Sequence, residues 1–349
     1  MQIRMATDAD QSDWDNYVLN HPDGLAYHQF AWKKAVNAAY GFADCYLLAE
    51  EQGTIVGVFP LIDFNVPFIG QSLVSLPYCD IGGCLADSDV VTAALLKQAV
   101  AIGQQKKSRK IEIRQSSVEK EIPSSGKVRM LLELPENSEK LLARLKAKLR
   151  SQVKKPLRDG LTAKMGGGEL VREFYPIFAR NMRDLGSPVH SRCWIDSVVA
   201  FYGDNCRVGV VYTADGIPAA AGIILLHRKT VSIPWASAVR KYNRLNPNML
   251  LYWTFLSFAA DTGYQQFDFG RSTPEEGTYR FKQQWGAQPK PLLWYRLTGS
   301  SIPSFSQVEN IERSCNSSSK RELVRSLWQK LPLTVANSVG PQVRKYISL

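Results

Sequence analysis

One order of predicted elements occurs twice along this chain, and this repetition constrains the fold more than any other feature of the sequence. A hairpin predicted around Gly53 has a counterpart around Gly216, 163 residues later. Each hairpin is followed by a strand, a loop, a helix and a final strand, and Gly263 after the second helix lies 160 residues beyond Gly103 of the first. The nearly constant offset predicts two copies of one α/β fold.

The elements of the two copies are assigned from alternating apolar residues in strands and from helical spacing in helices. In the first copy we expect strands over 2–7, 45–50, 54–62 and 110–114 and helices over 8–18, 28–40 and 90–104. In the second copy we expect strands over 210–213, 217–226, 231–236 and 266–269 and a helix over 249–260.

The length of 349 residues exceeds what one hydrophobic core usually serves, which favours two domains. The expected fold class is α/β (α+β), with mixed central sheets flanked by helices. We expect a first domain over 1–140, a second over 141–300, and a linker with an amphipathic tail over 301–349. The last residues, 331–349, either rest on the inner face of the cytoplasmic membrane or pack back onto the body.

The chain is strongly basic, with a net charge of +11. An excess of this size favours an anionic partner, which is a nucleic acid such as tRNA, a phosphate-bearing small molecule or an anionic membrane surface. The six cysteines form no CxxC pair and the four histidines are scattered, so we expect no metal site and no disulfide framework. No apolar run has the length of a signal peptide core or a membrane span, which favours a cytoplasmic location.

A basic loop distinguishes the second copy from the first. Arg240, Lys241 and Arg244 precede the predicted helix, whose unpaired N–H groups and dipole face the same anion as the cations. The first copy has Asp80 in the equivalent region, which repels phosphate. The loop therefore predicts a phosphate-bearing donor in the second copy, with a solvated surface turn as the alternative.

The stretch 267–287 combines a short strand, a turn-rich loop and a cluster of aromatic and basic residues. Phe281 beside Lys282 lowers the local dielectric, which strengthens the effect of the lysine on a nearby anion or carbonyl oxygen. The alternative is that Phe281 and Trp285 pack in the core while Lys282 points into water.

Three further segments carry candidate charges. A basic helix predicted over 141–160 either lies along a phosphate backbone or is solvated. The turn-prone segment 186–194 contains His190 and Arg192, which are candidates for binding an anionic acceptor. Lys34 lies on the helix over 28–40 and is solvated unless that helix lines a cleft.

Four segments of the chain are distinctive: LRSQVKKPLRDG at 149–160, GSPVHSR at 186–192, NPNMLLYW at 246–253, and FDFGRS followed by GTYRFKQQWGA at 267–287. Together they resemble the FemAB family, and most of all its subgroup associated with exosortase and PEP-CTERM systems. Members of this family are aminoacyl-tRNA-dependent peptidyltransferases and their relatives, built from two tandem acetyltransferase (GNAT) domains. The resemblance implies this tandem fold over nearly the whole chain.

The resemblance also implies the reaction and the residues that perform it. An amine acceptor attacks an activated acyl or aminoacyl carbonyl in exopolysaccharide or cell-envelope synthesis, with aminoacyl-tRNA as the expected donor and no tightly bound cofactor. Phe281 and Lys282 match the family's Phe-Lys pair and are the expected catalytic residues. The expected donor-binding residues are Arg240, Lys241, Arg244, Arg271, Tyr279 and Arg280, and the expected acceptor-binding residues are Lys34, Asp80, His190 and Arg192.

The acceptor is expected to be phosphate-bearing or sugar-linked, but two departures from the family leave it open. His190 stands where relatives carry an arginine, and Arg114, Gln115 and Ser116 stand where some carry an acidic residue. An acyl-CoA-dependent N-acyltransferase is one alternative, although the glycine-rich phosphate loop of acetyl-CoA enzymes is absent. A non-catalytic scaffold of a glycan-assembly system is the other.

Overall fold

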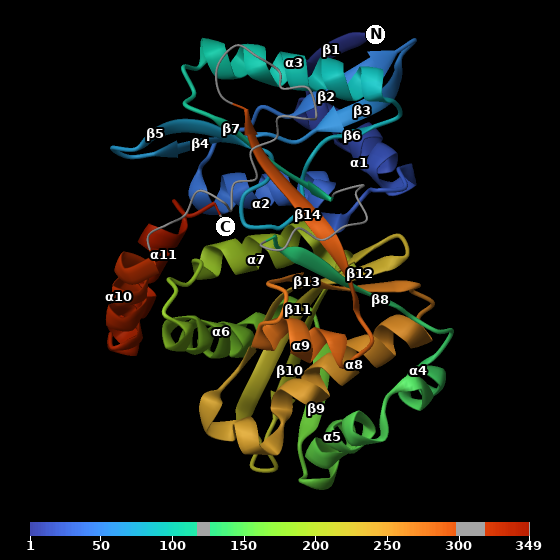
Figure 1. The fold of residues 1–349 in the computed structure, drawn as a ribbon, viewed down its shortest axis with the longest axis vertical. Coiled ribbons are helices and arrows are strands. Elements are labelled where there is room, and N and C mark those ends of the chain that lie inside the picture. The colour runs from blue at the N-terminus through green and yellow to red at the C-terminus, as the bar shows by residue number, and fades with distance from the viewer. Residues whose placement is uncertain (117–125, 298–317, 349) are drawn as a thin grey trace. The chain divides into compact units, whose positions relative to one another are not determined.

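The computed structural model describes residues 1–116, 126–297 and 318–348, and of residues 318–321 only the backbone (Figure 1). The chain forms two compact units. Unit 1 comprises Met1–Gly126, Pro291–Cys315 and Tyr346–Leu349, and unit 2 comprises Lys127–Lys290 and Asn316–Lys345. The sequence placed the boundary at residue 140 and kept residues 291–300 with the second domain, whereas here the last strand and the end of the chain belong to unit 1.

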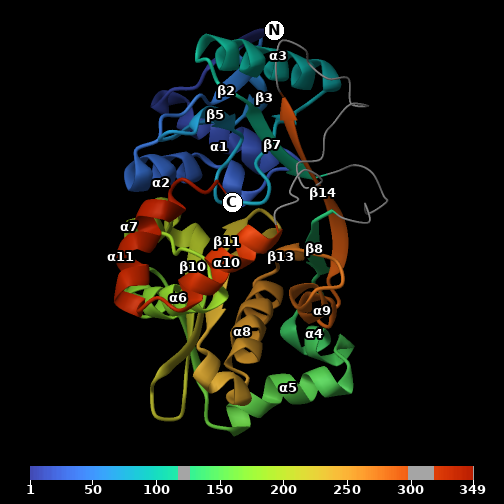
Figure 2. The same ribbon diagram turned by 60° about the vertical axis from the view of Figure 1, so that its left-hand side comes forward.

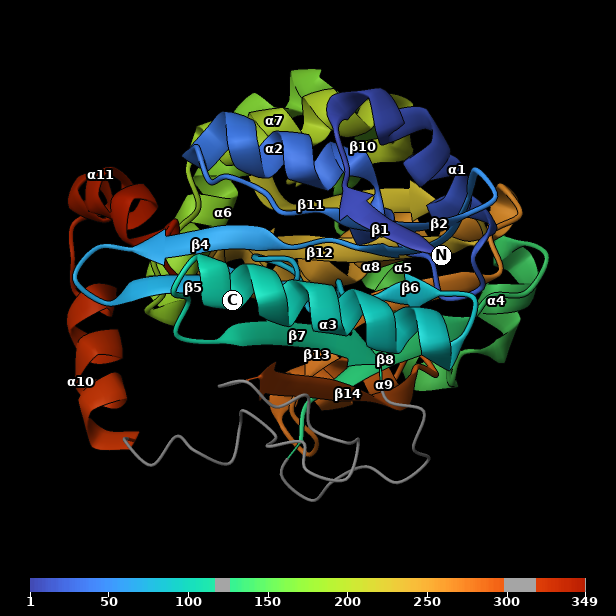
Figure 3. The same cartoon turned by 90° about the horizontal axis from the view of Figure 1, so that it is seen from above.

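Unit 1 contains short strands in two groups, with orders β1-β2-β3-β6 and β4-β5-β7-β14. Helices α1 and α3 both pack on β3, and α3 also packs on β6 and β7 (Figure 3). The turn between β2 and β3 has positive φ at Gln52 and Gly53, which matches the twist of a two-residue hairpin. The strands are β1 (Gln2–Met5), β2 (Leu47–Glu51), β3 (Thr54–Phe59), β4 (Ile62–Val66), β5 (Gly70–Val74), β6 (Leu85–Ala86), β7 (Ile111–Ser116) and β14 (Gln288–Leu297). The helices are η1 (Asp8–Asp10), α1 (Gln11–Asn20), η2 (Ala26–His28), α2 (Phe30–Tyr40) and α3 (Asp89–Gln105).

Unit 2 is built on a mixed sheet with strand order β8-β13-β12-β11-β10-β9. Its strands are β8 (Val128–Glu133), β9 (Thr162–Gly166), β10 (Cys206–Tyr212), β11 (Pro218–His227), β12 (Thr230–Ala238) and β13 (Gln266–Ser272). Its helices are α4 (Ser138–Arg144), α5 (Ala147–Arg158), η3 (Gly168–Leu170), α6 (Val171–Leu185), α7 (Arg192–Tyr202), η4 (Gly203–Asn205), η5 (Arg240–Leu245), α8 (Pro247–Asp261), α9 (Gly277–Gln283), α10 (Ser318–Gln329) and α11 (Leu333–Arg344).

Helices cover both faces of this sheet. The apolar helix α8 packs on β10, β11 and β12 and, with α4 and α5 behind it, forms the main core of unit 2, while α6 and α7 pack from the other side (Figure 2). Gly209 and Gly222 are paired across β10 and β11. The ring of Phe255 from α8 fills the space above them, so these two glycines set how closely α8 approaches the sheet.

The predicted repetition is confirmed, since both units contain a hairpin followed by a strand, a helix and a strand parallel to the one before the helix. The parallel pairs are β5 with β7 in unit 1 and β12 with β13 in unit 2. The long strand β11 corresponds in unit 1 to β3 and β4, which are separated at Pro60 because proline lacks the N–H that a continuous ladder needs.

The helix predicted over 141–160 is interrupted. Leu145 and Lys146 adopt extended backbone angles between α4 and α5, and the basic residues lie mainly on α5. The helix predicted over 249–260 is observed as α8, Pro247–Asp261, whereas the sequence analysis did not predict α6 and α7.

The C-terminal helices α10 and α11 pack on α6 of unit 2 (Figure 2). Arg325 donates to the carbonyl oxygen of Leu185 at 3.0 Å, and Arg183 donates to that of Leu331 at 3.2 Å. Residues 331–349 were predicted either to rest on the membrane or to pack onto the protein, and the described part of this segment packs onto the protein. Of the linker and tail predicted over 301–349, residues 301–317 lie outside the described residues. None of the described helices combines the length and apolar character of a membrane span.

We expect Gly209→Ala to lower the free energy of unfolding by about 1–3 kcal/mol, because its Cβ would lie 2.6 Å from Cζ of Phe255. Chemical denaturation measures this change. The matched control is Gly277→Ala at the start of α9, where an added Cβ meets no atom within 4 Å. Equal stability of the two variants would contradict the close packing of α8 on the sheet.

Candidate functional site in unit 2

The central feature of unit 2 is a gap between its two parallel strands. β12 and β13 are paired only from Thr230 with Gln266 to Ser232 with Asp268. Beyond this point β12 stays paired with β11 and β13 stays paired with β8, but the two strands no longer pair with each other. Past Ser232 and Asp268, the backbone groups of the two strands form no ladder with each other.

The sequences of β12 and β13 both explain why the two strands separate. Pro234 in β12 has no N–H to donate, and the register between β11 and β12 shifts near it. In β13 the register shifts between Asp268 and Arg271, and Gly270 has a φ of +70°. The sequence contains a signal for this separation, because Val-Ser-Ile-Pro-Trp at 231–235 repeats Val-Ser-Leu-Pro-Tyr at 74–78.

A buried ion pair lies at this bulge. Nε of Arg129 on β8 donates to Oδ2 of Asp268 at 2.8 Å, and both side chains are less than 10% exposed. The other carboxylate oxygen of Asp268 accepts the N–H of Gly270 at 2.8 Å. The pair therefore holds the backbone of β13 in its bulged conformation.

Two buried polar atoms beside this pair have no hydrogen-bond partner in the part of the chain that the structure describes. They are Nη2 of Arg129 and Oγ of Ser272. A buried guanidinium nitrogen without an acceptor is costly, and it is a candidate donor to an oxygen of a bound molecule. Sequence reasoning missed Arg129, although a charged residue between the apolar Val128 and Met130 of a strand indicates a buried partner.

Lys282 lies on α9 and its side chain reaches back to the same bulge. Its Nζ donates to the carbonyl oxygens of Gly270 at 3.1 Å and Arg271 at 2.7 Å, and the residue is 8% exposed. Phe281 does not share this environment, because its ring packs edge-on against Tyr252 at 5.0 Å on the α8 side. The expectation that Lys282 points into water is wrong, and Phe281 belongs to the periphery of the core.

The predicted basic loop is the 3₁₀ segment η5, directly before α8. Its three cations are exposed at the surface, and Arg240 donates to the carbonyl oxygen of Asp184 at 3.2 Å. Lys241 lies over the ring of Tyr242, and the carbonyl oxygen of Arg244 accepts from Lys155 of α5 at 3.2 Å. The segment therefore gathers positive charge from η5 and α5 at the N-terminus of α8.

The other donor candidates occupy different environments around α9. Arg271 is partly buried on β13, and Tyr279 is buried in the core against α8. Arg280 is exposed and lies 3.7 Å from Glu275, a pairing worth little at the surface. Of these three, Arg271 and Arg280 carry a positive charge that can bind an anionic ligand.

The candidates from 186–192 differ sharply in exposure. His190 is 2% exposed and its ring lies beside Trp194, and burial together with Arg344 holds the pKa of the imidazole well below 6.5. It is therefore neutral at pH 7 and supplies no positive charge to an anion. Arg192 is exposed at the start of α7, where it pairs with Asp196 at 3.3 Å.

Lys34 and Asp80 lie in unit 1. Lys34 donates to the amide oxygen of Gln11, whereas its neighbour Lys33 is 5% exposed and pairs with Asp8 at 3.2 Å. The backbone carbonyl of Asp80 accepts from the indole of Trp294 at 3.0 Å. Lys33, rather than Lys34, is the buried lysine of α2.

The gap that corresponds in unit 1 is filled by the chain itself. After Val74 pairs with Glu112, Oγ of Ser75 accepts the N–H of Arg114 at 3.1 Å. The carbonyl of Arg114 accepts from the N–H of Gly82 at 2.9 Å. In unit 1 these contacts use backbone groups of β7, whereas in unit 2 the carbonyl oxygens of Gly270 and Arg271 on β13 accept from Lys282.

Comparison with known proteins agrees with this geometry. Residues 143–283 match the protein family described as "Acetyltransferase (GNAT) domain". This segment contains η5, α8, the gap and Lys282, so unit 2 carries an acyltransferase domain of the GNAT type. No curated protein sequence matches the chain.

Solved structures share the fold at low sequence identity. The structure described as FemX superimposes with a TM-score of 0.69 at 14% identity, covering 86% of this chain and 98% of that one. The C-terminal domain of a putative lysylphosphatidylglycerol synthetase from Agrobacterium fabrum has a TM-score of 0.53 at 13% identity, covering 81% and 90%. A tandem GNAT protein from the clavulanic acid biosynthesis pathway has a TM-score of 0.52 at 10% identity, covering 87% and 100%. The predicted tandem GNAT-like fold is confirmed.

We expect Asp268→Ala to lower the free energy of unfolding by about 3–5 kcal/mol, because it leaves the buried Arg129 without its charge partner. The double variant Arg129→Met with Asp268→Leu removes both charges and recovers most of this loss. Chemical denaturation of the wild type, Arg129→Met, Asp268→Leu and the double variant gives the coupling energy. Strictly additive losses would show that the two side chains do not stabilise each other.

Proposed function

We propose that unit 2 transfers an acyl or aminoacyl group to an amine acceptor. The observation that carries the proposal is the gap between β12 and β13 within the segment that matches the GNAT family. In this reaction the amine nitrogen attacks the carbonyl carbon of the donor and the new C–N bond forms. The C–O bond of an aminoacyl ester, or the C–S bond of a thioester, breaks, and the leaving group takes up the proton that the amine loses.

The proposed donor is an aminoacyl-tRNA. The net charge of +11 and the cations of η5 and α5 favour a polyanion, and the resemblance to the FemAB family favours this donor class. Arg240, Lys241 and Arg244 would contact phosphates, with Arg271 and Arg280 nearer the transferred group. Tyr279 would act by packing α9 against the core.

The proposed role of Lys282 is electrostatic. Two backbone carbonyls hold its ammonium group at the bulge of β13, so little reorganisation is needed when negative charge develops on the reacting oxygen. The buried Nη2 of Arg129 is a second donor available to that oxygen. Phe281 would exclude water from one side of α9.

The acceptor is proposed to be a sugar- or peptide-linked amine of exopolysaccharide or envelope synthesis, in an exosortase and PEP-CTERM setting and in the cytoplasm. Lys34, Asp80, His190 and Arg192 remain its proposed contacts, with His190 contributing shape rather than charge. Peripheral contact with the inner membrane surface is proposed through α10, whose Leu323, Val324 and Leu327 are each more than 50% exposed.

An acyl-CoA-dependent N-acyltransferase is the second candidate. A parallel-strand gap beside a basic helix N-terminus suits an extended amide-bearing chain that ends in a pyrophosphate, as coenzyme A does. This candidate uses the same gap and the same three cations of η5. The two candidates differ in whether a nucleic acid is required.

Binding of charged tRNA, uncharged tRNA and acyl-CoA at one physiological salt concentration separates the candidates. We expect charged tRNA to bind at least about tenfold more tightly than uncharged tRNA, a difference of about 1.4 kcal/mol. Saturable acyl-CoA binding with equal affinity for both tRNA forms would reject the tRNA donor and favour the N-acyltransferase. Absence of selective binding to any of the three would reject transfer by unit 2 and favour a scaffold.

We expect Lys282→Met to reduce transfer about 100-fold or more while donor affinity changes less than about threefold, because the lysine acts mainly on charge that develops during the reaction. Release of free tRNA or free coenzyme A thiol with a panel of amines measures turnover. The matched control is Lys164→Met, an exposed lysine on β9. Equal activity of the two variants, with unchanged melting temperatures, would remove Lys282 from the mechanism.

A further inference from the structure

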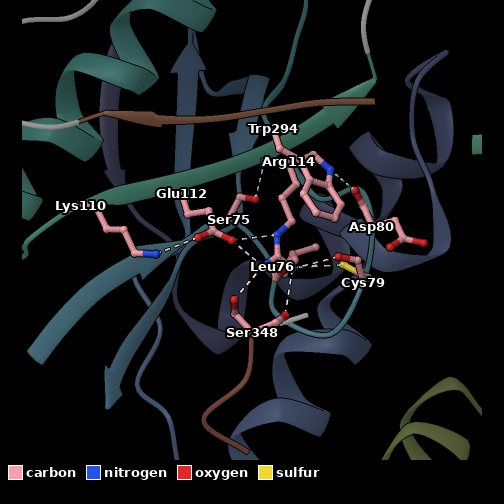
Figure 4. A network of polar contacts seen from close by, with 9 residues as sticks. All are labelled: Ser75, Leu76, Cys79, Asp80, Lys110, Glu112, Arg114, Trp294 and Ser348. Atoms are coloured by element: carbon pink, nitrogen blue, oxygen red, sulfur yellow. Dashed lines mark hydrogen bonds and ion pairs between the residues drawn. The ribbon is translucent and has the colours of Figure 1, made fainter. Parts of the chain in front are cut away.

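Unit 1 contains a buried polar cluster around Arg114 (Figure 4), in which the proposed transfer uses none of Glu112, Arg114 and Ser348. Arg114 on β7 is fully buried, and its guanidinium lies 5.3 Å from the ring of Trp294. It donates to a carboxylate oxygen of Glu112 through Nε at 3.2 Å and Nη2 at 2.6 Å. Its Nη1 also donates to the carbonyl oxygens of Leu76 at 3.1 Å and Cys79 at 3.0 Å.

The remaining acceptors of this cluster come from the far end of the chain. The carbonyl oxygen of Ser348 accepts from Nη1 of Arg114 at 2.9 Å and from the N–H of Tyr78 at 2.6 Å. The hydroxyl of Ser348 accepts from Nη2 of Arg114 at 2.8 Å. Three donors fixed in unit 1 thus converge on one residue that lies 234 positions from Arg114.

The backbone of Tyr78 is shaped for this contact. Its φ is +68°, a left-handed conformation that is costly for a residue with an aromatic side chain. This conformation accompanies an N–H that is directed at the carbonyl of Ser348. Strain that presents a donor to a partner is typical of a binding site.

An aromatic surface lies beside the three donors. The ring of Tyr346 packs edge-on against Phe42 at 6.4 Å, and Phe42 stacks on Phe64 at 4.8 Å. Tyr78 continues this surface through its contact with Tyr40 at 5.2 Å. Two residues of the tail, separated by one position, therefore occupy an aromatic subsite and a polar subsite.

The charge of the pocket favours oxygen-rich ligands. Although burial raises the pKa of Glu112, Arg114 and Lys110 lower it to about 2, so this carboxylate is ionised at neutral pH. The two ion pairs of the cluster join Glu112 to the cations Lys110 and Arg114. The carbonyl and hydroxyl oxygens of Ser348 complete the hydrogen bonding of the Arg114 guanidinium.

We infer that this pocket of unit 1 is a peptide-binding site, and that Tyr346–Ser348 is its intramolecular ligand. The site recognises a peptide segment with an aromatic residue followed, two positions later, by serine. When the tail leaves, the site takes such a segment from another molecule. This inference goes beyond the proposed transfer by unit 2 and does not depend on it.

The test uses the full chain with Tyr346→Ala and Ser348→Ala, which removes the ring and the hydroxyl but keeps the backbone. The probe is a fluorescein-labelled peptide of the sequence RKYIS, matching residues 344–348. We expect saturable binding to the double variant, and binding at least about tenfold weaker to the wild type, whose own tail competes at a high effective concentration. The control peptide RKAIA should bind neither protein, and adding Arg114→Lys to the double variant should abolish binding of RKYIS.

A folded double variant that binds neither peptide, or binds both equally, would overturn the inference. Hydrogen exchange of the wild-type protein provides a second measurement that needs no substitution. The amide of Tyr78 should exchange through local release of the tail, faster than the amides of β2 in the same unit. Exchange of Tyr78 and β2 at one common rate would show that the tail leaves only on global unfolding, and would also overturn the inference.

Discussion

The arrangement of unit 2 depends on the short pairing between two parallel strands. Parallel strands require a crossover, which α8 supplies, and its apolar surface packs on the sheet above the glycine pair Gly209 and Gly222. Because Pro234 and the bulge at Gly270 end the pairing after three residues, the crossover closes the core but leaves the strands apart beyond it. The short pairing of β12 with β13 therefore accounts for both the closed core and the gap.

The charged side chains at the bulge of β13 both stabilise the fold and position groups of the candidate site. The pair of Arg129 with Asp268 and the contacts of Lys282 with two carbonyls both act on the same few residues of β13. Removing water from such groups is costly, and the structure offsets that cost by satisfying nearly all of their hydrogen bonds. At this bulge the buried Nη2 of Arg129, which has no acceptor among the described residues, stands out for this reason.

The parallel pairing ends early in both units, but the contacts beyond its end differ between them. The repeated Val-Ser-Leu/Ile-Pro-aromatic segment ends the parallel pairing in both. In unit 1 the side chains of Ser75 and Arg114, together with the end of the chain, occupy the space. In unit 2 Lys282 and Asp268 instead contact the backbone of β13 past the end of the pairing.

The sequence by itself determined the duplication and the basic segment before α8, because these depend on local periodicity, turn residues and charge. The resemblance to the FemAB family implied the GNAT-like fold. It did not determine which charged residues are buried. Lys33 rather than Lys34 is enclosed, His190 is neutral, and Arg129 finds Asp268 139 positions away. Only the tertiary structure shows which of these groups are buried and that Ser348 contacts Arg114. Desolvation and ion pairing depend on neighbours that are distant in the chain.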